Sequence, residues 1–228
     1  MDHAYHRTTV VFWSVAGPAT RRPAHPPRTV EVVATDQSQK AGAVLIRDAQ
    51  VLDAPAMGEL MVTTWLRAHR AHIPAAAWHR RRASWTPEDS AAGWERHLRD
   101  RDADPGGAQA CYLVAEDPAG SLVAVAAAAV AANDPTGSTG EVGSLYVDPD
   151  HQRHGLGRQM LQQLATRLGT MGVRTLHIGV IATNVDAQRF YEALGGHPEG
   201  ERLFDEDGDL LPERIYAWPD LTTLLPQP

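Results

Sequence analysis

Hydrophobic and polar residues follow a strand-like and then a helical pattern in EVGSLYVDPDHQRHGLGRQML, residues 141–161. Residues 142–147 predict a strand, and the Asp-Pro-Asp of residues 148–150 predicts a turn. Beyond it, apolar side chains recur at the helical period of about 3.6 residues. They are Leu156, Met160, Leu161, Leu164 and Leu168. This stretch therefore predicts a strand, a glycine-bearing loop at residues 152–157 and a helix with one buried face.

The same reading predicts the elements before this stretch. Residues 43–47 form a short strand, and a helix runs from about Asp53, its cap, to His69. A basic, tryptophan-rich patch at residues 73–85 leads to a second helix, where Thr86 and Asp89 form a capping box. Residues 111–116 and 121–131 read as two strands. The alanine run at residues 126–129 has helical propensity, but the turn signals on both sides favour a strand. Its small side chains could leave space for a ligand on one face.

The pattern after the central stretch predicts a strand at residues 175–181 and a helix at residues 184–194. Two closing strands, near residues 197–203 and 211–218, flank an acidic segment at residues 204–209. This segment lacks the glycine and glutamate spacing of a calcium loop and is interpreted as a solvated turn. No zinc or other metal motif is present, so no metal is expected.

Composition limits the architecture and the partners. A chain of 228 residues with 43% hydrophobic side chains supports one domain, at residues 43–218. Residues 1–42 are proline-rich and are expected to be a mostly disordered extension with a short strand at residues 10–15, and residues 219–228 a tail. The net charge of −7 argues against nucleic acid. A single cysteine, expected to be buried, and the lack of an apolar run of about 18 residues favour a cytoplasmic protein without a membrane partner.

The loop at residues 152–157 has the physical properties of a phosphate site. Glycines allow close backbone approach, and the first turn of a helix presents amide groups without partners. With the helix dipole, these groups attract an anion. The loop is not a Walker loop, since no Gly-Lys-Ser/Thr follows, and Met160 stands where a dinucleotide fingerprint would have a third glycine.

Two motifs resemble those of the GNAT acetyltransferase superfamily. The first is Gln152-x-x-Gly155-x-Gly157, and the second, about thirty residues later, is Asn184-x6-Tyr191-x2-Leu194-Gly195. The resemblance extends over residues 44–218. It implies an α/β (α+β) fold with a single domain: a mixed, mostly antiparallel sheet with a splayed parallel strand pair, flanked by helices. Members often form homodimers, although no interface can be identified from the sequence.

The resemblance also implies acetyl-CoA as acyl donor and a set of residues that bind it. Backbone groups of the strand would pair with the pantetheine arm. Amides of the loop would hold the pyrophosphate, and Asn184 would contact the pantetheine end. The expected cofactor-binding residues are Leu145, Tyr146, Val147, Gln152, Arg153, His154, Gly155, Leu156, Gly157, Arg158 and Asn184.

Acetyl transfer to an amine requires a proton acceptor, a donor to the carbonyl oxygen and an acid for the leaving thiolate. Tyr191 matches the tyrosine of the superfamily that acts as acid; the alternative is a core aromatic beside Phe190. Glu141 is the candidate base, or an exposed carboxylate at the strand end. The amide of Val147 is the candidate oxyanion donor, and Tyr146 could line the site.

The acceptor is the least determined part of the prediction. In the superfamily it lies against the first helices and the late hairpin, which here suggests Trp65, His69, Ile73 and Trp78 as substrate residues. These aromatics could instead be core, and His69 with His72 could form a polar helix end. A small-molecule amine, such as an antibiotic, a polyamine or an amino-acid analogue, is the expected acceptor. The alternatives are a protein or peptide N-acetyltransferase and a non-catalytic acyl-CoA-binding module.

Overall fold

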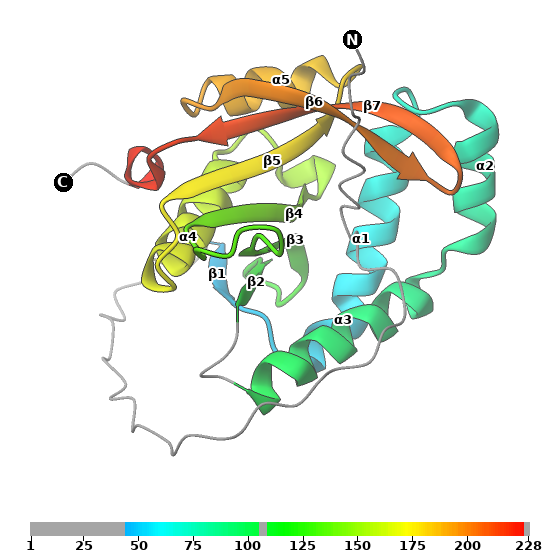
Figure 1. The fold of residues 1–228 in the computed structure, drawn as a ribbon. Helices are drawn as coiled ribbons and strands as arrows, with labels where there is room; N and C mark the ends of the chain where they lie inside the picture. Colours follow the sequence, from blue (N-terminus) through cyan, green and yellow to red (C-terminus); the bar gives the residue numbers. More distant parts are fainter. Residues whose placement is uncertain (1–43, 105–108, 226–228) are drawn as a thin grey trace, which may run out of the picture.

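The computed structural model describes residues 44–104 and 109–225. The expected extension at residues 1–42, with its short strand, lies outside the described residues. Seven strands form one mixed sheet in the order β1-β2-β3-β4-β5-β7-β6 (Figure 1). Their bounds are β1 (Leu45–Asp48), β2 (Ala110–Glu116), β3 (Leu122–Val130), β4 (Thr139–Val147), β5 (Thr175–Ile181), β6 (His197–Glu206) and β7 (Asp209–Trp218). Neighbouring strands are antiparallel except β4 and β5, which are parallel. The predicted fold class is confirmed.

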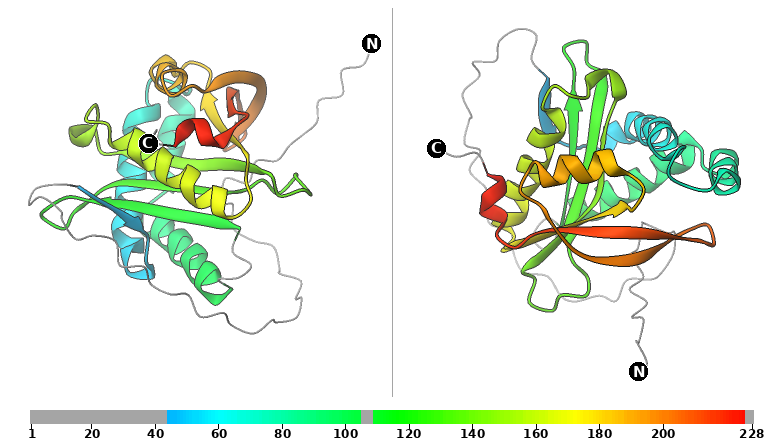
Figure 2. Two further views of the ribbon diagram at one scale, coloured as in Figure 1. Left: turned by 90° about the vertical axis from the view of Figure 1, so that its left-hand side faces the viewer. Right: turned by 90° about the horizontal axis from the view of Figure 1, so that it is seen from above.

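Helices cover both faces of the sheet (Figure 2). One face carries α1 (Ala54–His69) and α3 (Pro87–Ala103), with α2 (Ala75–Ser84) beyond them, and the other carries α4 (Leu156–Thr170) and α5 (Val185–Glu192). Strand β2 shows the division, because Cys111 and Leu113 belong to the cluster with α4, whereas Tyr112 and Val114 belong to the cluster with α1 and α3. The prediction of only two helices before β2 is wrong, because α2 lies within the patch at residues 73–85.

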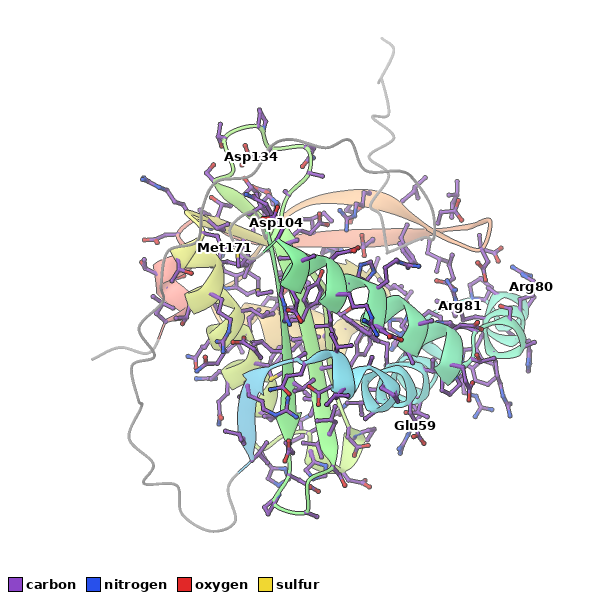
Figure 3. All side chains as sticks on the ribbon, turned by 90° about the horizontal axis from the view of Figure 1, so that it is seen from below. Glu59, Arg80, Arg81, Asp104, Asp134 and Met171 are labelled. Atoms are coloured by element: carbon purple, nitrogen blue, oxygen red, sulfur yellow. The ribbon has the colours of Figure 1, made fainter. Side chains whose placement is uncertain are left out.

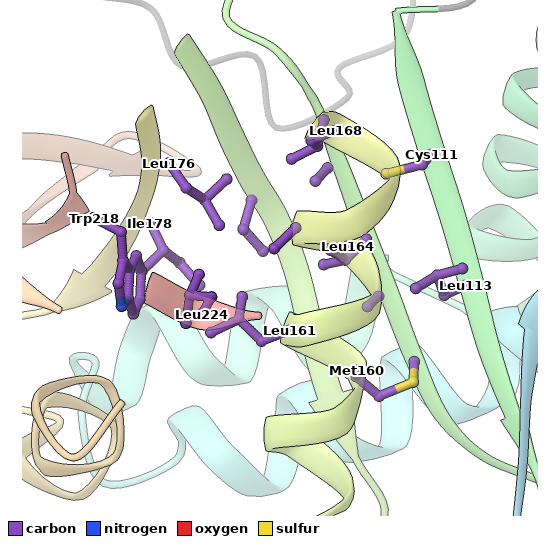
Figure 4. Packing of buried hydrophobic residues seen from close by; sticks show 14 of the residues in the cluster. Cys111, Leu113, Met160, Leu161, Leu164, Leu168, Leu176, Ile178, Trp218 and Leu224 are labelled. Carbon is purple, nitrogen blue, oxygen red and sulfur yellow. The ribbon is translucent and has the colours of Figure 1, made fainter. Parts of the chain in front are cut away.

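The larger core lies between α4 and the sheet (Figure 4). All five positions of the predicted apolar face of α4 are buried, and so is the free thiol of Cys111. Residues 126–129 lie within β3, as predicted. The expectation that they leave room for a ligand is wrong, because Ala126 and Ala128 pack in the α4 cluster and Ala127 in the α1–α3 cluster.

Strands β4 and β5 separate partway along their length. Residues 139–142 of β4 pair with residues 175–178 of β5, and both strands continue beyond Val142 and Ile178 without pairing to each other. At the same point the register between β3 and β4 shifts, which leaves Gly143 without an opposite residue. The splayed parallel pair expected from the sequence is therefore present, and we call this point the divergence.

Local predictions at the element ends had mixed outcomes. The capping box at Thr86 and Asp89 is confirmed. Asp53 does not cap α1 through its side chain, because its carboxylate accepts hydrogen bonds from Arg47 and from the amide of Gln50 instead. The predicted solvated turn is shorter than residues 204–209: Asp207 and Gly208 form an exposed turn, whereas β6 and β7 take up the rest and Glu206 is only 1% exposed. Within residues 219–228, Leu221 and Leu224 pack against the α4 cluster.

Candidate functional site

The loop before α4 presents free backbone amides at the end of β4. A 3-10 turn (Pro149–His151) follows the strand, and both Arg153, at φ 66°, and Gly155, at φ 83°, are left-handed. The first helical hydrogen bond runs from the amide of Gln159 to the carbonyl of Gly155, at 3.1 Å. The amides of residues 155–158 therefore have no acceptor within the helix. Arg153 and Arg158 are exposed and form no ion pair with any described residue, so the loop is suited to a multiply charged anion.

Two contacts fix this loop to its neighbours. The side-chain amide of Gln152 donates a hydrogen bond to the carbonyl of Val147 at 2.9 Å, which ties the loop to the end of β4. A methyl group at Gly157 would lie 3.2 Å from Cζ of Phe190, so the start of α4 packs closely on α5. His154 is exposed on the loop, whereas Leu156 points into the core. Gln152 thus has a positioning role.

The backbone of β4 faces the gap at the expected positions. The amide of Asp148 donates to the carbonyl of Val123 on β3. Because the direction of backbone groups alternates along an antiparallel strand, Tyr146 directs its groups to β3, while Leu145 and Val147 direct theirs towards β5. Strand β5 does not pair with this part of β4. The edge can therefore accept an extended ligand as an added strand.

Helix α5 carries the two residues of the second motif. Asn184 is its N-cap, and its side-chain oxygen accepts a hydrogen bond from the amide of Ala187 at 3.1 Å. Tyr191 is 7% exposed and lies among Phe190, Tyr216 and Trp218, at ring-centroid distances of 5.1 to 6.1 Å. Burial raises the pKa of the Tyr191 phenol well above 10, which keeps it protonated at neutral pH.

A carboxylate cluster that the sequence did not suggest lies on the opposite face of the sheet. Arg202 on β6 donates to Glu141 on β4 at 2.9 Å and also to Glu213 on β7. Glu213 is 4% exposed. Burial raises the pKa of Glu213 above its usual 4.5, against the opposing effect of Arg202. Glu141 is therefore not a lone carboxylate at the strand end. The sequence signal for Glu213 was its charge on a strand face whose neighbouring positions, Leu211 and Ile215, are apolar.

The predicted acceptor residues divide into two groups. Trp65, His69 and Tyr146 lie together: the first two rings stack at 4.6 Å between centroids, and His69 is 6.1 Å from Tyr146. His69 is the last residue of α1 and is half-buried, and burial lowers its pKa to about 4. Ile73 and Trp78 are also buried, and the Trp78 indole donates to the carbonyl of Leu66, so packing explains both.

Helix α2 closes this face against the β6–β7 hairpin. Arg80 pairs with Asp209, and Arg81 pairs with the buried Glu206. Figure 3 places both arginines on α2 at the edge of the molecule. The Arg81 guanidinium also lies 5.6 Å from the ring centroid of Trp65. The basic residues of the patch therefore hold α2 in place.

Other site types find no support within the part of the chain that is described. It contains no group of three or more side chains suited to a metal ion. None of its helices has both the length and the apolarity to cross a membrane. A hollow lies beside the β3–β4 connection, at the opposite end of β4 from the loop. The aspartate in that connection, Asp134, already accepts hydrogen bonds from its own turn, so the hollow takes no part in the site.

Comparison with known proteins gives partial relatives and a shared fold. The ribosomal protein bS18-alanine N-acetyltransferase of Salmonella typhimurium is 50% identical over 52 residues, 23% of this chain and 35% of that protein. The chain therefore spans about a third of the length of that relative. The N-acetyltransferase YuaI of Bacillus subtilis is 32% identical over 112 residues, 49% of this chain and 64% of that protein.

A solved structure extends the likeness to most of the fold. The Salmonella typhimurium protein yncA, determined with its cofactor acetyl-CoA, superimposes with a TM-score of 0.59 at 23% identity. The likeness covers 78% of this chain and 94% of that one. The sequence model of the acetyltransferase (GNAT) family matches residues 73–196, more than half of the 228 residues, and the chain therefore belongs to this family.

Proposed function

We propose that this protein is an N-acetyltransferase that moves the acetyl group of acetyl-CoA to a primary amine of a small molecule. The observation that carries the proposal is one continuous surface for an acyl-CoA. It begins at the free amides of residues 155–158 and continues along the unpaired edge of β4 to the divergence. Family membership and the acetyl-CoA of the yncA structure support the same donor.

The donor would lie along this surface in one direction. The pyrophosphate fits the amides of residues 155–158, with Arg153 and Arg158 beside it. The pantetheine arm would pair with Leu145 and Val147. From Val147 to Gly143 the strand extends about 13 Å, at roughly 3.3 Å per residue, and this places the thioester near the divergence. Asn184, whose side-chain nitrogen is not used by its cap, would contact the arm from α5.

The chemistry requires three groups near the thioester. An outward-facing amide of β4 would donate to the carbonyl oxygen as negative charge develops. The amide of Leu145 is nearer the divergence than that of Val147, so we assign to Leu145 the stronger hydrogen bond to this oxygen. Tyr191 would protonate the leaving thiolate, because it stands where the superfamily carries its acidic tyrosine and its phenol is protonated at neutral pH. The amine must lose a proton before it attacks, and Glu141, on the Arg202 cluster, is the acceptor that the sequence suggests.

A small acceptor is favoured by the ion pairs between α2 and the hairpin. They join the two elements that border the acceptor face, which limits the room for a long peptide. The second candidate is the N-terminal amine of a protein, favoured by the 50% identity to the bS18-alanine enzyme over 52 residues. With either acceptor, a neutral amine attacks the thioester.

Calorimetric titration with acetyl-CoA tests the donor, and thiol release tests the reaction. The screen should hold aminoglycosides, polyamines, amino-acid analogues and short peptides with a free N-terminus. Micromolar binding with thiol release on one class would support the proposal and choose between the two acceptors. Binding without release on any amine would favour the non-catalytic acyl-CoA-binding module. Absence of binding would refute the role of the loop.

Gly155→Glu tests the loop itself. The substitution puts a carboxylate beside the amides that would hold the pyrophosphate, and we expect acetyl-CoA affinity to fall at least about 100-fold, the loss of two charge-assisted hydrogen bonds. Gly137→Glu is the matched control, since Gly137 also has a positive φ, 69° against 83°, and lies at the other end of β4. Equal affinities in the two variants would contradict the placement.

A further inference from the structure

Arg202 holds two carboxylates, and they differ in their position relative to the divergence. Glu141 is opposite His177, within the segment where β4 and β5 still pair. Glu213 is opposite Ile181, beyond that segment, on the strand that borders the other edge of β5. Both contact the same guanidinium, through Nη1 and Nε respectively. The pair therefore offers two candidate proton acceptors with one shared partner.

Gly179 shows where the Glu213 carboxylate lies. This glycine directly follows Ile178, the last residue of β5 that pairs with β4. A methyl group at Gly179 would lie 2.3 Å from the carboxyl carbon of Glu213. Gly179 is not among the residues with positive φ, so its backbone conformation does not require glycine. The missing side chain instead gives the Glu213 carboxylate room against β5, at the divergence.

The surroundings of Glu213 suit a proton acceptor. The Glu213 side chain is 6% exposed, whereas the Glu141 side chain is 30% exposed. Withdrawal from water raises the pKa of Glu213 above its usual 4.5, which makes the carboxylate a stronger base. Burial raises the pKa of the Tyr146 phenol, and the charges of Glu206 and Glu213 add to this shift.

We propose that Glu213, held by Arg202 and given room by Gly179, is the catalytic residue that takes the proton from the incoming amine. Glu141 is then a positioning residue, which fixes the other side of the Arg202 guanidinium. This inference rests on the proposed acetyl transfer and replaces the proton acceptor suggested by the sequence.

The proton balance is as follows. The ammonium substrate gives one proton to the Glu213 carboxylate, which later releases it to solvent. The freed lone pair forms the C–N bond with the thioester carbonyl carbon, and the C–S bond breaks. The sulfur takes a proton from Tyr191. The second proton that the nitrogen loses restores the Tyr191 phenol through water, so the products are the amide, the free thiol and one released proton.

Glu213→Gln and Glu141→Gln are a matched pair, because each removes one anionic partner of Arg202. With the amine found in the screen, we expect Glu213→Gln to lower kcat about 100-fold or more and to remove the acidic limb of the pH profile. We expect Glu141→Gln to keep kcat within about tenfold, with the acidic limb intact. Both should bind acetyl-CoA with wild-type affinity, as measured by calorimetry.

Gly179→Ala tests the placement without changing any charge. The new methyl group meets the flexible end of the Glu213 side chain, which can move aside, so the fold should tolerate it. We expect kcat to fall at least about tenfold with acetyl-CoA affinity unchanged. This variant also decides the question if Glu213→Gln does not fold.

The outcomes separate the two proposals. Wild-type kcat in Glu213→Gln or Gly179→Ala, with normal acetyl-CoA binding, would overturn the role of Glu213 and leave acetyl transfer standing. A large loss of kcat in Glu141→Gln alone would identify Glu141 as the proton acceptor. Lack of acetyl-CoA binding by the wild-type protein would overturn the proposed function instead.

Discussion

His69 makes the stability of this fold depend on pH in a defined range. Its ring stacks on Trp65, and its Nδ1 lies 3.0 Å from the Trp65 carbonyl oxygen, to which it can donate. Burial lowers the pKa of His69 from 6.5 to about 4, and this carbonyl opposes the shift only in part. The folded protein therefore holds His69 neutral at a pH where the unfolded chain binds a proton.

The sign follows from linkage between protonation and folding. Because the folded pKa is depressed, the contribution of His69 is fully present above pH 6.5 and is lost as the pH falls towards 4. The difference of about 2.5 pH units, at about 1.4 kcal/mol each, sets an upper limit of about 3.5 kcal/mol. His69 is partly exposed, so solvent screening brings the expected value to about 1–3 kcal/mol.

The test compares the wild type with His69→Phe, which keeps a stacking ring and cannot bind a proton. Urea unfolding at pH 7 and pH 4 gives the free energy of unfolding of each protein. We expect the wild type to lose about 1–3 kcal/mol more than the variant between these values. His97, whose pKa burial also lowers to about 4, remains in both proteins, so the variant keeps some pH dependence.

Equal losses of unfolding free energy in the two proteins between pH 7 and pH 4 would refute the link between His69 and stability. A wild-type His69 ring resonance that titrates near pH 6.5 in NMR would refute the lowered pKa. The ring resonance is assigned by its absence from His69→Phe. Reduced stability of the variant at pH 7 alone would report only the missing hydrogen bond to Trp65, about 1 kcal/mol.

Two further predictions use matched variants. Tyr191→Phe should lower kcat about 100-fold and leave acetyl-CoA affinity unchanged, whereas Tyr216→Phe, in the same aromatic cluster, should keep kcat within a few-fold; equal effects in steady-state kinetics would make Tyr191 a packing residue. Gly58→Ala should destabilise the protein by about 1–3 kcal/mol in urea unfolding, because its methyl group would lie 2.6 Å from the Ala91 backbone nitrogen; Gly93→Ala, with open space, should not destabilise it.

What the sequence predicted well was local. The apolar face of α4 repeats within fifteen residues, and the box between Thr86 and Asp89 is formed by neighbours. The alanine run of β3 was assigned correctly because turn residues bound it on both sides. In each case the deciding interactions lie within one element or one turn, so residue order alone contains the signal.

Helix α2 was missed for a physical reason. Only Ala77 and Trp78 are buried in it, so no apolar stripe marks its period. Its position depends on ion pairs of Arg80 and Arg81 with the β6–β7 hairpin, more than 120 residues further along the chain. The weak signal that could have indicated it was Pro74 followed by three alanines, a helix start with high propensity.

The two halves of the candidate site differ in the same way. The donor half consists of backbone amides in one short loop, and glycine spacing reports such a loop directly. The proposed acceptor half uses Glu141, Arg202 and Glu213, which come together only because the sheet order is β4-β5-β7-β6. The clearest sequence signal for the acceptor half is the glycine at position 179. The reason for this glycine is visible only in the structure, where the Glu213 carboxylate occupies the space that a side chain would fill. In this fold the order of residues therefore predicts the donor site, whereas the acceptor site depends on the register between strands that are distant in the chain.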